Sequence, residues 1–195
     1  MSVDPEDFII TRKRKLYKFA LFTNASLCFE FDEWDHEFIP DTIEIGAGTG
    51  LFSVELATMY PDRTFVAVDV KADRLQKGAQ LADERKLTNI RFLRARADQL
   101  VEIFQPSILH SIWLTFPDPF PRKRSAGRRL THPTYLAQYR QLLAPNGSLL
   151  FKHDNADFFQ WSLEQLVSDE WHIRELSFDL HESTLAGDYK ILTTY

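Results

Sequence analysis

Short apolar runs alternate with helix-like patterns along most of this chain of 195 residues. The runs are bounded by turn residues, and the stretches between them repeat apolar side chains at helical spacing. This alternation predicts βαβ units, and therefore an α/β fold with a parallel sheet and helices on both faces. The expected strands are 42–46, 64–69, 90–94, 111–115, 148–152 and 172–180. The expected helices are 49–60, 72–86, 132–143 and one that begins at Asp154 or Asn155 and carries apolar residues up to Leu166, before Ser168.

The domain organisation follows from length and composition. Residues 41–195 are expected to form a single domain, and residues 1–40, rich in aromatic side chains, an N-terminal extension that packs on it. No stretch is apolar enough to cross a membrane, and the N-terminus lacks the plan of a signal peptide, so we expect a cytoplasmic protein. Cys28 is the only cysteine, which excludes an internal disulfide and a thiolate metal cluster.

A glycine-rich segment, EIGAGTG at 44–50, lies where the first expected strand turns into a helix. Glycines there let the backbone approach a ligand closely. The spacing G-x-G-x-G differs from the G-x-G-x-x-G that binds a pyrophosphate, and this favours a nucleoside cofactor without one. Glu44 is an acid in an apolar strand and needs a hydrogen-bonding or cationic partner. The sulfonium of an S-adenosylmethionine cofactor would supply one.

Asp69 ends the second expected strand, where an acid in a nucleotide-binding sheet accepts the ribose hydroxyls. A glycine loop alone is also compatible with a structural turn, and an aspartate alone with a helix cap. The two together, joined by a helix, favour S-adenosylmethionine binding.

The segment TFPDPFPRKRSAGRRL, at 115–130, combines one acid with a dense run of positive charge. Pro117 and Pro119 restrict the backbone around Asp118, so we expect this acid in a rigid extended turn. The cations that follow are suited to nucleic-acid phosphates, although a solvated loop is the alternative. They are Arg122, Lys123, Arg124, Arg128 and Arg129.

Charge is concentrated in patches on this chain. The net charge is −5, with 23 basic and 28 acidic residues, and five basic residues of the 12–18 segment form a second cluster. An acidic body with two basic patches is compatible with a nucleic-acid partner. His132, His153 and His172 lack the spacing of metal ligands, so we interpret them as capping or surface residues and expect no metal.

Five segments resemble the bacterial tRNA (guanine-N7)-methyltransferase family, in the same order and at matching spacing. They are EIGAGTG at 44–50, DVK at 69–71, FPDPFPRKR at 116–124, RRL at 128–130 and FKHDN at 151–155. The resemblance implies a class I S-adenosylmethionine-dependent methyltransferase with a Rossmann-like sheet, which methylates the variable-loop guanine of tRNA at N7.

The same resemblance implies roles for individual residues. Asp118 would be the active-site acid. The cofactor contacts would be Glu44, Gly46, Gly48, Asp69, Arg96, Ala97 and Asp118. The substrate contacts would be Arg122, Asp154 and Thr193.

The chain departs from the family pattern at three places. Arg96 stands where an aspartate or asparagine is usual, and Arg122 stands where lysine is usual. The family motif Thr-x-Tyr-Glu continues into a last strand, whereas this chain ends at Tyr195, so we expect that strand to be missing. Two other functions stay open: methylation of another RNA or a small molecule, and RNA binding without catalysis.

Overall fold

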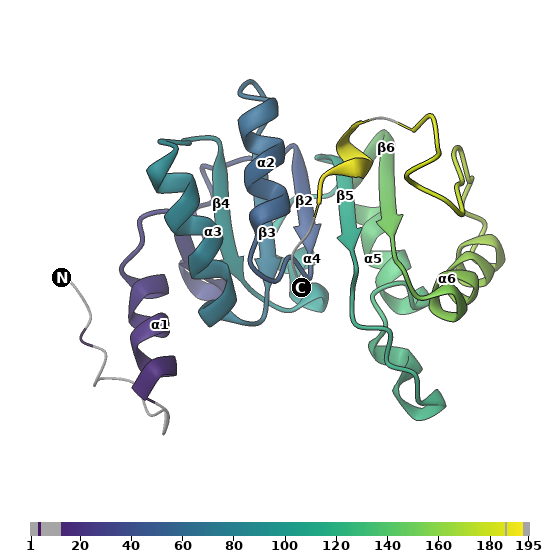
Figure 1. Ribbon diagram of the computed structural model, residues 1–195, viewed down its shortest axis with the longest axis horizontal. Helices are drawn as coiled ribbons and strands as arrows, with labels where there is room; N and C mark the ends of the chain where they lie inside the picture. Colours follow the sequence, from purple (N-terminus) through teal and green to yellow (C-terminus); the bar gives the residue numbers. More distant parts are fainter. Residues whose placement is uncertain (1–3, 5–12, 186, 193–195) are drawn as a thin grey trace.

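The computed structural model describes residues 4, 13–185 and 187–192, and its centre is a six-stranded sheet (Figure 1). The strands are β1 (Cys28–Glu30), β2 (Thr42–Ile45), β3 (Phe65–Asp69), β4 (Ile90–Arg94), β5 (Leu109–Thr115) and β6 (Leu143–Lys152). The helices are α1 (Lys13–Thr23), α2 (Leu51–Met59), α3 (Ala72–Glu84), α4 (Leu100–Ile103), α5 (Pro133–Leu142) and α6 (Ala156–Ser168). Within these described residues, no helix is long and apolar enough to cross a bilayer.

The strands lie in the order β1-β4-β3-β2-β5-β6, and all the neighbouring pairs are parallel. The chain runs from β2 outward to β4 and then crosses back to β5 on the other side of β2. The order therefore reverses between β2 and β5, and open sheets of this kind bind ligands at the carboxyl end of such a reversal. The expected α/β fold with a parallel sheet is confirmed.

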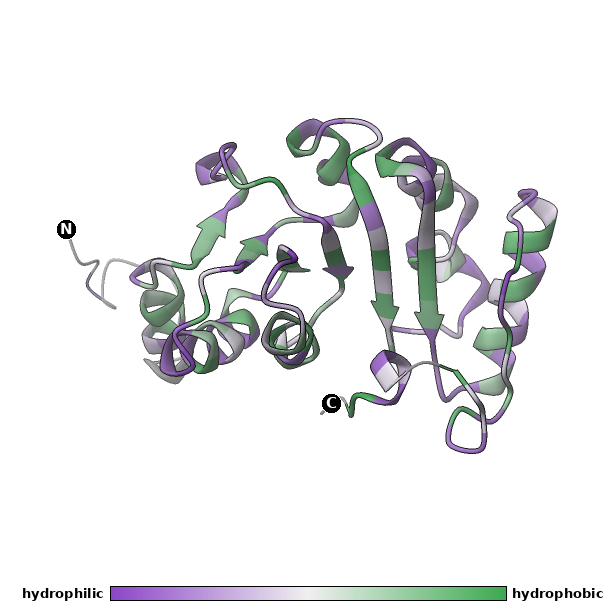
Figure 2. Ribbon diagram, turned by 90° about the horizontal axis from the view of Figure 1, so that it is seen from above, coloured by the Kyte–Doolittle hydropathy of each residue, from purple (hydrophilic) through white to green (hydrophobic). Residues whose placement is uncertain are grey.

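Helices cover both faces of the sheet, as the view from above shows (Figure 2). Strand β3 illustrates the division, because successive side chains of a strand point to opposite faces. Phe65 and Ala67 join the core formed with α2 and α3, whereas Val66 and Val68 join the core formed with α4 and α5. All four side chains are at most 1% exposed. A strand buried on both faces explains the unbroken apolar run in the sequence.

The N-terminal segment contributes a strand to the sheet. Cys28–Glu30 pairs with β4, placing Phe29 opposite Leu93, and α1 lies against α3 with Phe22 1% exposed. The sequence interpretation did not anticipate β1, because a three-residue strand is too short to show a periodic pattern.

The expected strand 172–180 is wrong: the structure gives this segment an irregular path beside β6. Its apolar side chains do not share a buried face, since Leu176 is 49% exposed and Phe178 is 82% exposed. The apolar positions Ile173 and Leu176 are also three residues apart, which breaks the period of two that a strand requires.

The segment Pro145-Asn146-Gly147 consists of residues that are typical of a turn. Helix α5 already ends at Leu142, and β6 begins at the next residue. The register with β5 shifts from Leu109↔Leu143 to Ser111↔Ser148, so the turn residues form an irregularity within β6. Asn146 adopts a positive φ of 68° there, a conformation that asparagine tolerates better than most residues.

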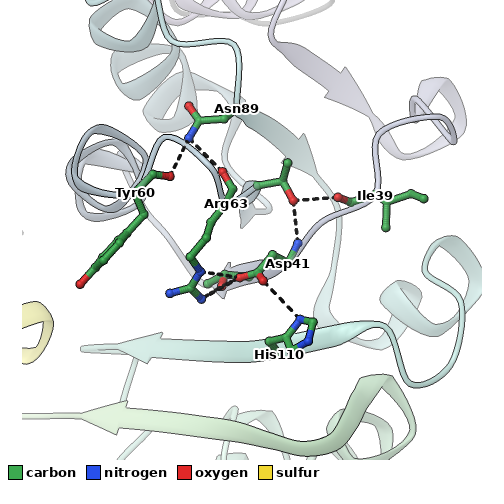
Figure 3. Close-up of polar contacts among 8 residues, drawn as sticks. Ile39, Asp41, Tyr60, Arg63, Asn89 and His110 are labelled. Atoms are coloured by element: carbon green, nitrogen blue, oxygen red, sulfur yellow. Dashed lines mark hydrogen bonds and ion pairs between the residues drawn. The ribbon is translucent and has the colours of Figure 1, made fainter.

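A polar cluster lies at the amino-terminal edge of the sheet, opposite the carboxyl ends of the strands (Figure 3). Asp41 accepts two hydrogen bonds from Arg63, at 2.8 and 2.6 Å, and lies 3.2 Å from His110. The Asn89 amide donates to the carbonyls of Tyr60 and Arg63, at 3.2 and 2.9 Å. These bonds tie the loop after α2 to the start of β4, and thereby hold the sheet together far from its carboxyl edge.

Candidate active site

The loop after β2 lies at the carboxyl edge of the sheet and depends on glycine. Gly46, Gly48 and Gly50 adopt φ angles of +75°, +57° and +71°, in the region that side chains disfavour. A fourth glycine, Gly78 of α3, brings that helix against the loop: a Cβ there would lie 2.4 Å from the carbonyl oxygen of Thr49. The loop is thus closely packed from behind, and its glycines leave no Cβ to block a ligand.

Asp69, at the end of β3, holds this loop. Its two carboxylate oxygens accept hydrogen bonds from the backbone N–H groups of Gly48 and Lys71, each at 2.8 Å. Burial raises the pKa of Asp69, and the two hydrogen bonds oppose that change. Each oxygen keeps acceptor capacity, so the carboxylate has room for a further donor such as a hydroxyl.

Glu44 is fully buried in β2, with 2% of its surface exposed. Its carboxylate accepts hydrogen bonds from the hydroxyls of Ser53, at 2.6 Å, and Thr115. Burial raises the pKa of Glu44 to about 7, while the two hydroxyls and the charge of Lys152 act in the opposite direction. The partner expected for this buried acid is therefore present within the chain itself.

A cavity at the carboxyl edge brings together the glycine loop and the buried Glu44. Glu44, Gly46 and Gly48 line one side of it, and Thr115 and Phe116 line the other. It lies between the ends of β2 and β5, where the strand order reverses. The glycine backbone and the buried acid fit a small nucleoside ligand.

Arg96 and Ala97 follow β4 at the same edge. The Arg96 guanidinium forms two hydrogen bonds with Asp98, both 2.9 Å long, and its backbone N–H donates to Gln99. The Arg96 side chain is thus directed at Asp98, and two of its donors are used there.

The turn that carries Asp118 follows β5. The carboxylate is exposed, and the phenylalanines on either side of the turn, Phe116 and Phe120, have positive φ angles of 48° and 39°. Phe116, the residue before Pro117, is thus outside the right-handed α region, as a following proline favours, with a positive φ in place of an extended backbone. Phe116 donates its backbone N–H to the carbonyl of Lys152, and this bond to β6 accompanies a conformation that costs about 1 to 3 kcal/mol.

His153, at the end of β6, contacts this turn. Its Nδ1 accepts a hydrogen bond from the backbone N–H of Asn155, so Nε2 carries the ring proton and donates to the Pro117 carbonyl, at 2.9 Å. Only 5% of the side chain is exposed, and burial lowers the pKa of His153. His153 is therefore not a surface residue, although its Nδ1 accepts a backbone N–H at the start of α6, as a capping residue would.

Arg129 contacts the turn from the other side. Its guanidinium donates to the carbonyls of Pro119, at 2.9 Å, and Phe120, at 3.1 Å, and stacks over the Trp161 ring of α6 at 4.2 Å. Arg129 was expected to contact phosphates with the rest of the basic run, but its donors are directed at protein carbonyls.

The remaining cations of the basic run are exposed. Arg128 lies over the Phe120 ring at 4.5 Å, which places a cation beside the Asp118 turn. The exposed members are Arg122, Lys123, Arg124 and Arg128.

Two expected substrate contacts remain. Asp154 is exposed at the carboxyl end of β6, one residue before the Asn155 cap of α6. Thr193 lies outside the described residues. The segment that leads to Thr193 is held by Lys152, whose Nζ donates to the carbonyls of Tyr189, at 3.2 Å, and Ile191, at 2.9 Å.

The fold and this site define a class I S-adenosylmethionine-dependent methyltransferase. Solved structures support the fold: an antibiotic-related methyltransferase matches with a TM-score of 0.55 at 16% identity, over 72% of this chain and 73% of that one. The antibiotic-resistance methyltransferase Kmr also matches with a TM-score of 0.55, at 19% identity, over 76% of this chain and 90% of that one.

Sequence comparison identifies the family. The model described as "Putative methyltransferase" matches residues 39–193. The tRNA (guanine-N(7)-)-methyltransferase of Brevibacillus brevis is 38% identical, covering 92% of this chain and 85% of that protein. The protein of the same name from Cytophaga hutchinsonii is 37% identical, covering 82% of this chain and 76% of that one. The chain belongs to the bacterial tRNA (guanine-N7)-methyltransferase family.

Proposed function

We propose that this chain transfers the methyl group of S-adenosylmethionine to N7 of the variable-loop guanine of tRNA. The observation that carries the proposal is the position of Asp118, an exposed acid that follows Phe116, a residue lining the cavity with the glycine loop, and precedes an exposed run of cations. Relatives of this chain bear the name of that activity.

The cofactor is assigned to the cavity between β2 and β5. The backbone at Gly46 and Gly48 would lie against it, Asp69 would accept ribose hydroxyls, and Glu44 would face its charged end. The backbone of Arg96 and Ala97 would border the adenine. When bound, the cofactor supplies an electrophilic methyl group.

Methyl transfer to guanine N7 requires mainly that the protein hold the two reactants in position. Guanine N7 carries a free lone pair and needs no deprotonation before it attacks. Holding the two reactants in line contributes up to roughly 7 to 11 kcal/mol when the geometry is right. Positive charge develops on the purine, and the fixed carboxylate of Asp118 would stabilise it electrostatically without acting as a base.

Other residues would hold the tRNA. The exposed cations, Arg122 among them, would neutralise backbone phosphates, which gives affinity but no sequence selection. Asp154 and Thr193 would contact the nucleotide that is modified. Because the substrate is tRNA, a cytoplasmic location is part of the proposal.

Transfer of labelled methyl from S-adenosylmethionine to bulk tRNA, followed by nucleoside analysis, tests the proposal. We expect the label in 7-methylguanosine, and none in a tRNA transcript whose variable-loop guanine is replaced by adenosine. Label in a different nucleoside or in a small molecule would indicate another methyltransferase. If the protein binds tRNA without the cofactor and transfers no methyl group, it would be an RNA-binding protein without catalysis.

A further inference from the structure

The turn that presents Asp118 is held by side chains on both sides of the acid. The carbonyl of Pro117, just before Asp118, accepts from His153 at 2.9 Å. The carbonyl of Pro119, just after it, accepts from Arg129 at 2.9 Å. We propose that Arg129 and His153 are positioning residues that fix the Asp118 carboxylate for methyl transfer.

The Arg129 side chain contacts both the turn and helix α6. Its guanidinium lies over Trp161 at 4.2 Å and also reaches the Phe120 carbonyl at 3.1 Å, so a single planar group joins α6 to two successive carbonyls of the turn. A planar guanidinium with several donors suits such a contact, whereas a lysine ammonium has no comparable shape. Its neighbour Arg128 is exposed, which separates the roles of the two arginines.

The contact from His153 has a defined direction. Asn155 donates its backbone N–H to Nδ1 at 2.8 Å, so the proton on Nε2 is available for the Pro117 carbonyl. The ring packs edge-to-face on Phe158 at 4.8 Å between centroids. Asn155 caps α6 and Phe158 lies in its first turn. His153 and Arg129 therefore both connect the turn that carries Asp118 to the same helix.

The backbone of the turn is strained, so it needs contacts that hold it in place. Phe116 and Phe120 both adopt positive φ, which a free loop would relax. Asp118 itself is exposed, so burial does not fix it. The hydrogen bonds from Arg129 and His153 to the flanking carbonyls therefore help to hold the backbone of the turn in this conformation. This inference rests on the proposed role of Asp118.

Arg129→Gln tests the inference, with Arg140→Gln as a matched control. Arg140 also donates to a backbone carbonyl, that of Asp169, and lies over a tryptophan ring, that of Trp171, but near the end of α5 that leads into β6. Arg129→Gln loses one charge, two carbonyl contacts and the contacts with the Phe158 and Trp161 rings. Arg140→Gln also loses one charge, with one carbonyl contact, one ring contact and an ion pair with Asp169. Only Arg129→Gln should affect the turn.

Two measurements are made on each variant. Amide exchange by mass spectrometry, on the peptide that spans 116–125, should accelerate in Arg129→Gln and not in Arg140→Gln. The single-turnover methylation rate, with cofactor and tRNA saturating, should fall about 10²-fold in Arg129→Gln alone, because displacement of a reacting group by about 1 Å costs that much. Arg129→Lys should recover only part of the rate.

His153 supplies an independent pair of variants should Arg129→Gln fail to fold. His153→Gln keeps a donor for the Pro117 carbonyl and should retain more of the single-turnover rate than His153→Leu, which has none. Unchanged exchange at 116–125 in the Arg129 and His153 variants would overturn the inference, as would faster exchange with an unchanged rate. If the parent protein methylates no tRNA while exchange at 116–125 is still faster in the variants than in the parent, the proposed function would be overturned and the role of Arg129 and His153 in holding the turn would stand.

Discussion

The carboxylate of Asp69 accepts a hydrogen bond from the backbone N–H of Gly48 at 2.8 Å, so the acid that ends β3 shapes the loop that follows β2. The residue proposed to bind the cofactor ribose is thus also part of the wall against which the cofactor would lie. Effects of changing Asp69 on binding and on stability should therefore be measured together.

Replacement of Asp69 by alanine should weaken S-adenosylmethionine binding by about 1.5 to 3 kcal/mol, the usual value of hydrogen bonds to a charged group. It should also lower the free energy of unfolding, because two backbone N–H groups lose their acceptor. Calorimetric titration and chemical denaturation measure the two effects. Asp83→Ala, at an exposed position of α3, is the control; an unchanged affinity in Asp69→Ala would remove the ribose assignment.

Glu44 should make stability depend on pH. Its ordinary pKa is 4.5 and its pKa in the folded protein is about 7, so the folded state binds more protons between these values. Stability should then fall as the pH rises from about 4.5 to 7, by about 2 to 3 kcal/mol in total. Lys152, whose pKa is lowered to about 8, acts at higher pH, where stability should rise as the pH increases toward 10.5.

The variant Glu44→Gln isolates this contribution, because it removes the titrating group while keeping its size. Denaturant unfolding of the cofactor-free protein between pH 4.5 and 7 should show a decline in the parent and a smaller decline in Glu44→Gln. Glu55→Gln removes an exposed glutamate of α2 and should leave the decline unchanged. Equal slopes in the parent and in Glu44→Gln would mean that the buried acid keeps an ordinary pKa.

Arg128 should contribute to tRNA affinity through counterion release. In Arg128→Gln the slope of log affinity against log salt should decrease by about 1, whereas cofactor affinity should not change. Arg129→Gln should alter this slope less, since its guanidinium is bound to protein carbonyls. Arg85→Gln, a cation paired with Glu55, is the control. If Arg128→Gln keeps the parent slope, the exposed run is only a solvated surface.

The change Asp118→Asn tests the electrostatic mechanism. The amide keeps the size of the side chain and one acceptor but loses the charge, so the rate of methyl transfer should fall about 10²-fold or more. Both ligands should still bind, because the prolines and the contacts from Arg129 and His153 remain. Single-turnover kinetics at saturation is the measurement. A rate within about twofold of the parent would assign the catalysis to positioning alone.

Asn89 should matter for stability and not for chemistry. Its amide donates to three carbonyls that follow or end α2, those of Ala57, Tyr60 and Arg63. Asn89→Ala leaves these carbonyls without this donor and should cost about 1 to 3 kcal/mol in denaturant unfolding. Methyl transfer per folded molecule should stay at the parent value. Gln80→Ala, at an exposed position of α3, should cost little; equal losses in both would show that the Asn89 bonds add nothing.

The central strands β2 and β3 could be predicted because they are buried on both faces and therefore read as apolar runs between turns. The exceptions have physical causes. Strand β1 has only three residues, and the expected strand 172–180 mixes polar and apolar residues without a common buried face. The local order of polar and apolar residues does not show which distant segment of the chain a strand will pair with.

Some residues of the candidate site could also be located from the sequence, and others could not. Glycines and acids at strand ends have a recognisable spacing, so Gly46, Gly48 and Asp69 could be located from the sequence. His153 and Arg129 could not be assigned correctly, because their tasks are set by carbonyls 36 and 10 residues away. The signal in the sequence was that both residues lie within segments that resemble the family, RRL and FKHDN.

The outer position of β1 bears on the order in which the fold is assembled. β1 comes first along the described chain, yet its only neighbour, β4, becomes available after two further strands and two helices have been made. A nascent chain therefore has to keep Phe22 and Phe29 from other contacts until β4 is in place. Phe22, 1% exposed in the finished protein, is accordingly a residue whose exposure during synthesis would report how far folding has advanced.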